Sequence, residues 1–184
     1  MLQWVSEHFK ELGVDPERIM IAGGSGGGGL TAGTGLLARD RKGPQVCAQF
    51  LACPMLDDRN ITTSSKQYSN EGTWSRESNE MAWGQVLGGK AGQDGVSYYA
   101  APARAEDLSG LPPTFIDVGS AEVFRDESVA YATKLWAAGV QADLYVYGGA
   151  FHAYEALAPQ SRLALQTDAV RLSWVKAILG NKNQ

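Results

Sequence analysis

The chain has 184 residues, of which 44% are hydrophobic and 20% charged, and its formal net charge is −4. These values predict a globular protein with a hydrophobic core, and they argue against a nucleic-acid partner or an anionic membrane surface. No apolar stretch reaches the roughly 20 residues of a membrane-spanning helix, and the N-terminus does not read as a signal peptide. We therefore expect a cytoplasmic protein.

Helix and strand patterns alternate along the chain. An amphipathic helix over residues 1–12 precedes a short apolar strand over 19–22, a helix over 30–40 and a strand over 46–52. Further on, "PPTFIDVGS" predicts a strand, "EVFRDESVAYATKLWAAG" a helix, "QADLYVYGG" a last strand, and residues 162–179 a closing helix. This alternation predicts an α/β three-layer sandwich with a mostly parallel sheet. Since no repeat or linker divides the chain, we interpret residues 1–184 as one domain.

Residues 57–95 break this rhythm. They are polar, and they contain one predicted helix that begins near Ser75, whose hydroxyl would cap it. We interpret the segment as a cap-like insertion. Its Tyr68, Trp74 and Trp83 are candidates for the floor of an apolar pocket, and equally for core positions.

The two cysteines, Cys47 and Cys53, belong to one apolar run, "QVCAQFLACP". In an extended strand they would lie about 20 Å apart, whereas a disulfide needs Cα atoms within about 7 Å. We expect free, buried thiols.

The glycine-rich stretch "GGSGGGGL" at residues 23–30 stands between a predicted strand and a predicted helix. Gly23-x-Ser25-x-Gly27 is typical of a nucleophile elbow, in which a serine lies on a strained turn above the sheet. The overlapping Gly24-x-Gly26-x-x-Gly29 is typical of dinucleotide binding, although the acidic residue that this motif needs does not follow at its usual distance. A third interpretation is structural, with the glycines allowing close packing of helix and sheet.

A serine nucleophile needs a base and an acid that orients the base. His152 follows the last predicted strand, whereas His8, the other histidine, lies in the polar N-terminal helix. Glu122 follows the preceding strand; Asp126 and Glu127 suit the first turn of the next helix, and Asp117 lies inside the strand. The order Ser25, Glu122, His152 is that of the nucleophile, acid and base in α/β-hydrolases.

With these residues in view, the sequence resembles the α/β-hydrolase family of the hormone-sensitive-lipase type, which includes many carboxylesterases. "GGSGGGGL" aligns with the family's Gly-Asp-Ser-Ala-Gly-Gly-Gly-Leu elbow, "EVFRDE" with its acid motif, and "YGGAFHAYE" with its histidine segment. The resemblance implies ester hydrolysis of a small-molecule substrate without metal or organic cofactor, with Ser25, Glu122 and His152 as the triad. It implies that the N–H of Gly26 contributes to the oxyanion hole. Two positions depart from the family: Gly24 replaces an acid, and Glu122 replaces the usual Asp.

The family also carries a His-Gly-Gly-Gly oxyanion motif upstream of the elbow, and nothing in the 24 residues before Ser25 resembles it. We therefore expect a truncated α/β-hydrolase fold that lacks the N-terminal strands. The strand before Ser25 would then form a sheet edge, which self-association into a homo-oligomer would cover. The alternative is a catalytically weak or inactive hydrolase that acts as an interaction module.

Overall fold

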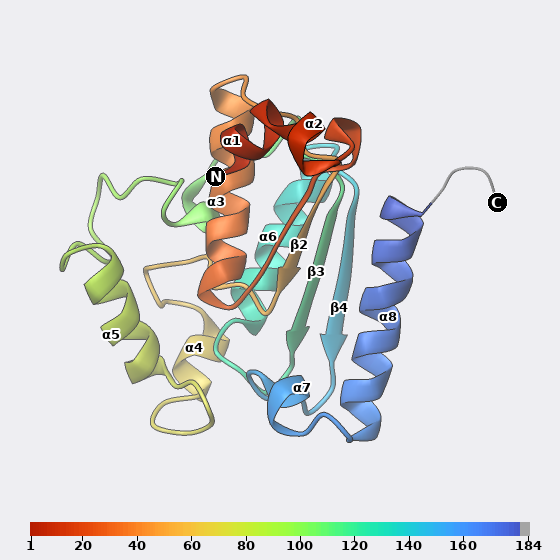
Figure 1. Ribbon diagram of the computed structural model, residues 1–184. Helices are drawn as coiled ribbons and strands as arrows, with labels where there is room; N and C mark the ends of the chain where they lie inside the picture. The colour runs from red at the N-terminus through yellow and green to blue at the C-terminus, as the bar shows by residue number, and fades with distance from the viewer. Residues whose placement is uncertain (181–184) are drawn as a thin grey trace.

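Four parallel strands form one sheet in the computed structural model, which describes residues 1–180 (Figure 1). They follow the spatial order β1-β2-β3-β4. Their bounds are β1 Met20–Gly24, β2 Ala48–Ala52, β3 Thr114–Gly119 and β4 Ala142–Tyr147. Because all strands run in the same direction, their carboxyl ends lie at one edge of the sheet.

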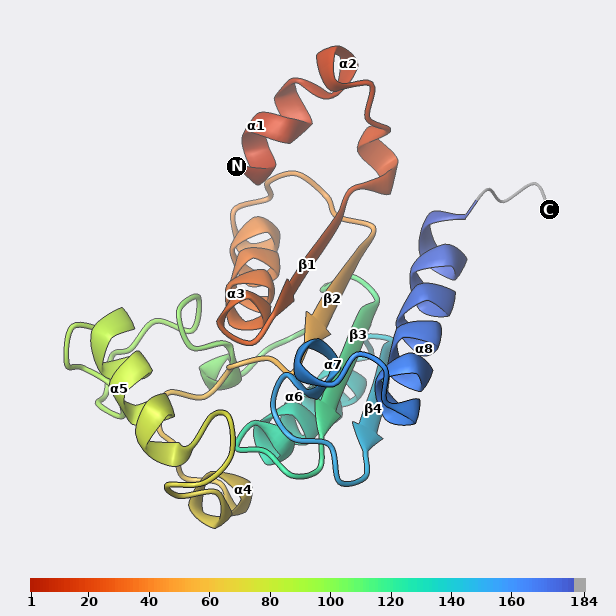
Figure 2. The same cartoon turned by 60° about the horizontal axis from the view of Figure 1, so that its bottom comes forward.

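Helices cover the sheet in the predicted three layers. Helices α3 (Gly26–Asp40) and α6 (Arg125–Ala137) pack on one face, where Leu36, Leu51, Ile116 and Leu135 belong to one buried cluster. Helix α8 (Arg162–Leu179) covers the other face, as Figures 1 and 2 show, and its Trp174 ring contacts Phe50 and Phe115. The prediction of an α/β sandwich with a parallel sheet is therefore confirmed.

Burial on both faces explains the composition of β3. All six of its residues are buried, as expected for a central strand of a parallel sheet with helices on either side. Asp117 is the one acidic residue in this strand, and it is 1% exposed. A carboxylate in such a position requires a charged or hydrogen-bonding partner.

The N-terminal segment departs from the prediction. The expected helix is interrupted at His8, so that α1 (Leu2–Glu7) and α2 (Phe9–Leu12) are separate. The His8 ring stacks on Trp4 with 4.5 Å between ring centroids. Neither short helix contains a buried residue, so the predicted apolar stripe does not enter the core among the described residues. A 3₁₀ turn over Pro16–Arg18 leads into β1.

Residues 57–95 project from one side of the sandwich with helices α4 (Thr63–Gln67) and α5 (Arg76–Val86), as Figure 2 shows. The predicted cap of α5 is confirmed, since Ser75 Oγ accepts a hydrogen bond from the N–H of Ser78 at 3.4 Å. Helix α4 was not predicted. A 3₁₀ turn over Pro102–Arg104 leads from this segment toward β3.

Of the segment's three aromatic residues, Trp83 occupies a core position, whereas Tyr68 and Trp74 are half-buried. Trp83 is 3% exposed, and it belongs to a second buried cluster with Met55, Val118 and Phe124. Tyr68 and Trp74 pack against the same cluster.

The cysteines are free, as expected, but only Cys53 is buried. Cys47 is half-buried and directly precedes β2, which begins at Ala48. Within residues 1–180, no helix combines the length and the apolar composition needed to cross a lipid bilayer.

Candidate active site

Three predicted site residues meet at the carboxyl edge of the sheet. Ser25 directly follows β1, Glu122 follows β3, and His152 follows β4. Ser25 Oγ lies 3.0 Å from His152 Nε2, and His152 Nδ1 lies 2.6 Å from Glu122 Oε2. The structure thus aligns hydroxyl, imidazole and carboxylate in one hydrogen-bonded chain.

Ser25 occupies a sharp turn between β1 and α3. Its φ of 55° and ψ of −122° lie in a region that side-chain-bearing residues rarely adopt. The backbone holds this conformation from both sides, because the N–H of Ser25 donates to Ala52 O at 2.9 Å, and Ser25 O accepts from Gly29 and Met55 at 3.2 and 3.0 Å. Such a turn exposes the hydroxyl above the sheet, as in a nucleophile elbow.

Close packing accounts for several of the surrounding glycines. A Cβ on Gly23 would lie 2.1 Å from Gly27 O, and one on Gly29 would lie 2.2 Å from Met55 O. A Cβ on Gly24 would meet nothing closer than 3.7 Å. The turn thus requires glycine at 23 and 29, and it leaves space for a side chain at 24.

Burial differs along the hydrogen-bonded chain. Glu122 is 2% and His152 7% exposed, while Ser25 is only half-buried. Glu122 Oε1 accepts the N–H of Gly119 at 2.8 Å, so both carboxylate oxygens have partners. The acid and the imidazole are therefore fixed in a dry environment, and the hydroxyl faces an accessible surface.

The other candidate acids have different partners. Asp117 pairs with Arg171, and Asp126 accepts from the N–H of Ser64 at 2.7 Å. Glu127 is fully buried and accepts from the N–H of Leu56 at 2.7 Å. Glu122 is thus the acidic residue that the fold brings to His152.

Gly26 is the first residue of α3. Its N–H belongs to the first helical turn, whose donors have no partner inside the helix. The positive end of the helix dipole lies at the same place, which favours a developing negative charge beside Ser25.

Sequence reasoning missed the surroundings of His152. The His152 ring contacts Phe124 edge-on at 5.2 Å between centroids. The backbone carbonyl of His152 accepts a hydrogen bond from Thr73 Oγ1 at 2.5 Å. Ala153, the next residue, has a left-handed φ of 60°. No local sequence pattern predicts these contacts, because Thr73 and Phe124 are distant from His152 in the sequence.

Cys53 is also adjacent to the site. Its Sγ and ligand atoms of Glu122 and His152 lie within 4.8 Å of one another, a set that in principle suits a metal ion. Burial raises the pKa of the Cys53 thiol, and the nearby carboxylate of Glu122 raises it further. Because the thiol is protonated and the other two groups bond each other, we assign no metal role to this set.

Comparison with known proteins identifies the fold family. Residues 1–156 match the family model described as alpha/beta hydrolase fold. Carboxylesterase NlhH of Mycobacterium tuberculosis is 36% identical over 145 residues, a match that covers 78% of this chain and 45% of that protein. The chain spans about half the length of the relatives it matches.

Solved structures give the same result. A bacterial heroin esterase has a TM-score of 0.90 and 38% identity, with 97% of this chain and 57% of the other covered. An esterase from the bacterial hormone-sensitive lipase family has a TM-score of 0.81 and 30% identity, with 96% and 57% covered. The chain belongs to the α/β-hydrolase fold family, and it is similar to esterases of the hormone-sensitive-lipase type.

Proposed function

We propose that this protein is a serine hydrolase that cleaves carboxylic esters, with Ser25, His152 and Glu122 as its catalytic triad. The observation that carries the proposal is the pair of contacts at His152, 3.0 Å from Nε2 to Ser25 Oγ and 2.6 Å from Nδ1 to Glu122 Oε2. These distances suit proton transfer from the hydroxyl and orientation of the imidazole. The esterases among its relatives support the same reaction class.

The proposed reaction has two stages. Ser25 Oγ attacks the acyl carbon while His152 Nε2 takes the hydroxyl proton, and the N–H of Gly26 stabilises the oxyanion. His152 then delivers the proton to the leaving alcohol, and an acyl-enzyme remains on Ser25. Water, activated by His152, hydrolyses this intermediate and regenerates Ser25. Glu122 holds the imidazole tautomer and stabilises the imidazolium throughout.

The proposed substrates are small esters with short to medium acyl chains. We interpret residues 1–184 as one domain with a cap-like insertion over residues 57–95. The position of Trp74 supports the cap, because its ring lies beside His152 with 6.1 Å between ring centroids. The half-buried Ser25 allows an ester to approach from the surface.

Hydrolysis of p-nitrophenyl acetate and butyrate tests the proposal. We expect turnover by this chain that Ser25→Ala abolishes, and labelling of Ser25 by a fluorophosphonate. Ser173→Ala, which alters an exposed serine of α8, is the matched control and should leave both unchanged. A folded chain that neither turns over esters nor takes the label would refute the enzyme proposal and favour a catalytically inactive interaction module.

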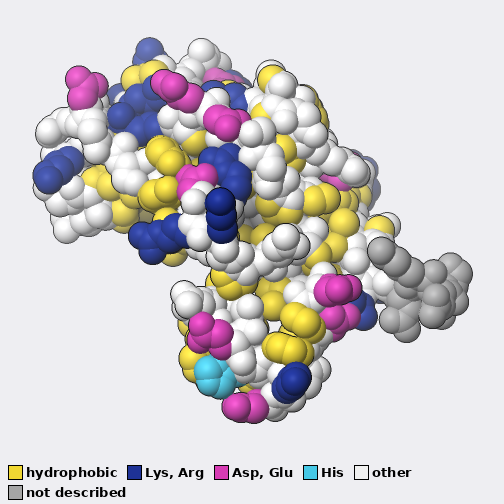
Figure 3. Space-filling view, turned by 90° about the horizontal axis from the view of Figure 1, so that it is seen from above, with side chains coloured by type: hydrophobic (Ala, Val, Ile, Leu, Met, Phe, Trp, Pro, Cys, Tyr) yellow, Lys and Arg dark blue, Asp and Glu magenta, His cyan; other side chains and the backbone are white. Residues whose placement is uncertain are grey.

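We also propose a homo-oligomer formed through the β1 edge. Within residues 1–180, β1 is the last strand on its side of the sheet, and beside it lies an apolar groove of about 530 Å³ lined by Met1, Leu2, Val5 and Leu30 among others. Viewed from above, hydrophobic side chains gather in the hollow beside the N-terminal helices (Figure 3). Unpaired strand edges favour pairing with another chain. Sedimentation at micromolar concentration tests this, and a monomer would contradict it.

A further inference from the structure

An ion cluster outside the proposed triad lies beside the loop that carries His152. Arg171 of α8 pairs with Asp117 through two hydrogen bonds, Nε to Oδ2 at 2.6 Å and Nη2 to Oδ1 at 3.0 Å. The same Nη2 donates to Glu155 Oε1 at 2.9 Å. One guanidinium therefore joins two carboxylates from separate elements.

These carboxylates belong to the two segments that deliver the acid and the base. Asp117 lies in β3, the strand that leads to Glu122. Glu155 lies in the short helix α7 (Tyr154–Leu157), which begins two residues after His152. Arg171 thus connects the segment that follows His152 to the strand that leads to Glu122. It does so from the face of the sheet that α3 and α6 do not cover.

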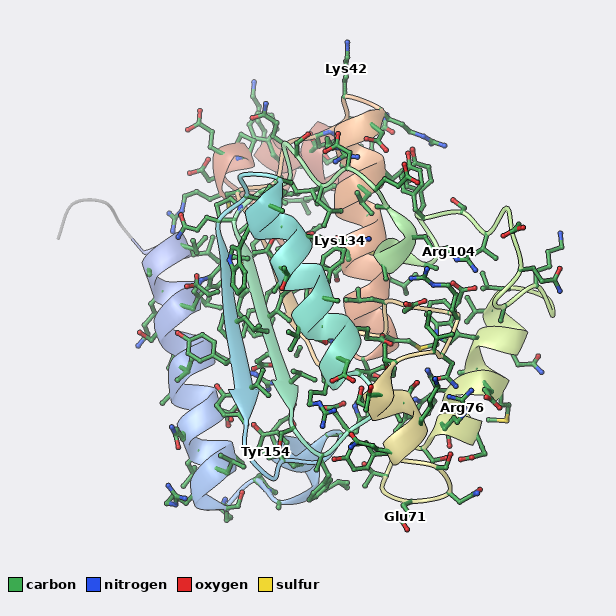
Figure 4. All side chains as sticks on the ribbon, turned by 180° about the vertical axis from the view of Figure 1, so that it is seen from behind. Lys42, Glu71, Arg76, Arg104, Lys134 and Tyr154 are labelled. Carbon is green, nitrogen blue, oxygen red and sulfur yellow. The ribbon has the colours of Figure 1, made fainter. Side chains whose placement is uncertain are left out.

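A second link between α7 and α8 accompanies the first. Tyr154 and Thr167 form a hydroxyl–hydroxyl hydrogen bond, and Thr167 lies one helical turn before Arg171 on α8. Figure 4 shows Tyr154 near the carboxyl ends of β3 and β4. One face of α8 therefore holds α7 at two points.

The loop needs such external support because its own backbone is strained. Ala153 has a φ of 60°, a conformation that costs an alanine about 1 kcal/mol or more. Helix α7 has four residues, too few to be stable without tertiary contacts. If α7 moved, His152 would lose its alignment with Ser25.

We propose that Arg171 is a positioning residue that acts on His152 through Glu155. This inference builds on the proposed function, since the reaction is where the alignment matters. A misplacement of about 1 Å at a reacting group can cost on the order of 100-fold in rate. Arg171 does not touch the reacting atoms. We therefore expect a weakened Arg171–Glu155 contact to lower kcat and to leave KM nearly unchanged.

The two arms of the cluster can be separated by mutation. Asp117 has a side chain that is 2% exposed, so removal of Arg171 would leave a buried carboxylate without its cation and would destabilise the fold. The Glu155 side chain is 19% exposed, and Glu155→Gln leaves the Asp117–Arg171 pair intact. This variant weakens the arm that reaches the His152 loop.

Kinetics of Glu155→Gln test the proposal first. We expect kcat to fall roughly tenfold and KM to stay within about twofold, with partial recovery in Glu155→Asp. The matched control is Asp40→Asn at the end of α3, which weakens the Arg39–Asp40 pair, where both side chains are 21% exposed. The control should keep the parent kcat, and all variants should keep a cooperative thermal transition.

Histidine NMR gives a second readout that does not depend on turnover. The chain has only two histidines, so His8 serves as the internal reference for His152. In Glu155→Gln we expect the ring signals of His152 to shift or broaden while those of His8 stay unchanged. Altered His152 signals in a chain without esterase activity would support the positioning role and refute the proposed function. Unaltered His152 signals, or an unaltered kcat in an active chain, would overturn the positioning role.

Discussion

Glu122 bridges His152 and the end of β3 with its two carboxylate oxygens. Oε2 lies 2.6 Å from His152 Nδ1, and Oε1 accepts the N–H of Gly119 at 2.8 Å. One carboxylate oxygen therefore binds the imidazole, and the other binds the backbone at the end of β3. This arrangement explains how the fold accommodates glutamate at the acid position.

The first prediction concerns this carboxylate. Glu122→Gln should lower kcat for p-nitrophenyl butyrate by on the order of 10³- to 10⁴-fold, because an amide cannot stabilise the imidazolium. Glu122→Asp keeps the charge but shortens the reach, so we expect a smaller loss, with kcat between the parent and the glutamine variant. Equal activity of the glutamine variant and the parent would show that Glu122 does not orient His152.

A second prediction separates two adjacent glycines of the elbow. Gly23→Ala should destabilise the fold by about 1–3 kcal/mol or more, since its Cβ would lie 2.1 Å from Gly27 O. Gly24→Ala should stabilise it by up to about 1 kcal/mol, because the nearest atom is 3.7 Å away and alanine restricts the unfolded chain. Urea denaturation of both variants measures the contrast, and a similar effect at the two positions would contradict the packing argument.

The sequence was sufficient to predict that the three candidate site residues lie together, because each follows the end of a strand. Ser25, Glu122 and His152 each follow a strand of a parallel sheet, and parallel strands bring their carboxyl ends to a common edge. Strand burial and helix periodicity are local signals, so the layers could be predicted as well.

What could not be predicted depends on contacts between distant residues. The partners Asp117, Glu155 and Arg171 come from a strand and two helices, and no spacing relates them. Helices α4 and α7 have five and four residues, too few to carry a periodic pattern, and tertiary contacts stabilise them. The break at His8 likewise leaves the apolar spacing of residues 1–12 unchanged while it removes the continuous helix.

A third prediction concerns thiol reactivity. Burial raises the pKa of Cys53, and so do the carboxylates of Glu122, Glu155 and Asp117, whereas Cys47 is only half-buried. Because the thiolate is the reactive species, iodoacetamide at pH 8 should modify Cys47 well before Cys53 in the folded chain. Mass spectrometry of Cys47→Ser and Cys53→Ser measures the two rates separately, and in urea they should converge. Faster modification of Cys53 in the folded chain would contradict the assigned environment.

The last prediction concerns the pH dependence of stability. Glu127 is fully buried, and burial raises its pKa well above the ordinary value of 4.5, although the N–H of Leu56 bonds its Oε1 and opposes the shift. At a pH between 4.5 and the raised pKa, Glu127 holds its proton in the folded chain and has released it in the unfolded chain. The contribution of Glu127 to stability is therefore complete at low pH and falls as the pH rises through this window.

Glu127→Gln should remove this dependence, because glutamine can still accept from Leu56 and does not ionise. The free energy of unfolding of the variant minus that of the parent should rise from pH 5 to pH 8, by about 1.4 kcal/mol for each pKa unit of the shift that lies within this range. Urea denaturation at four pH values measures this difference, with Glu106→Gln at an exposed position as the matched control. A difference that stays constant with pH would mean that Glu127 ionises as readily in the folded chain as in the unfolded one.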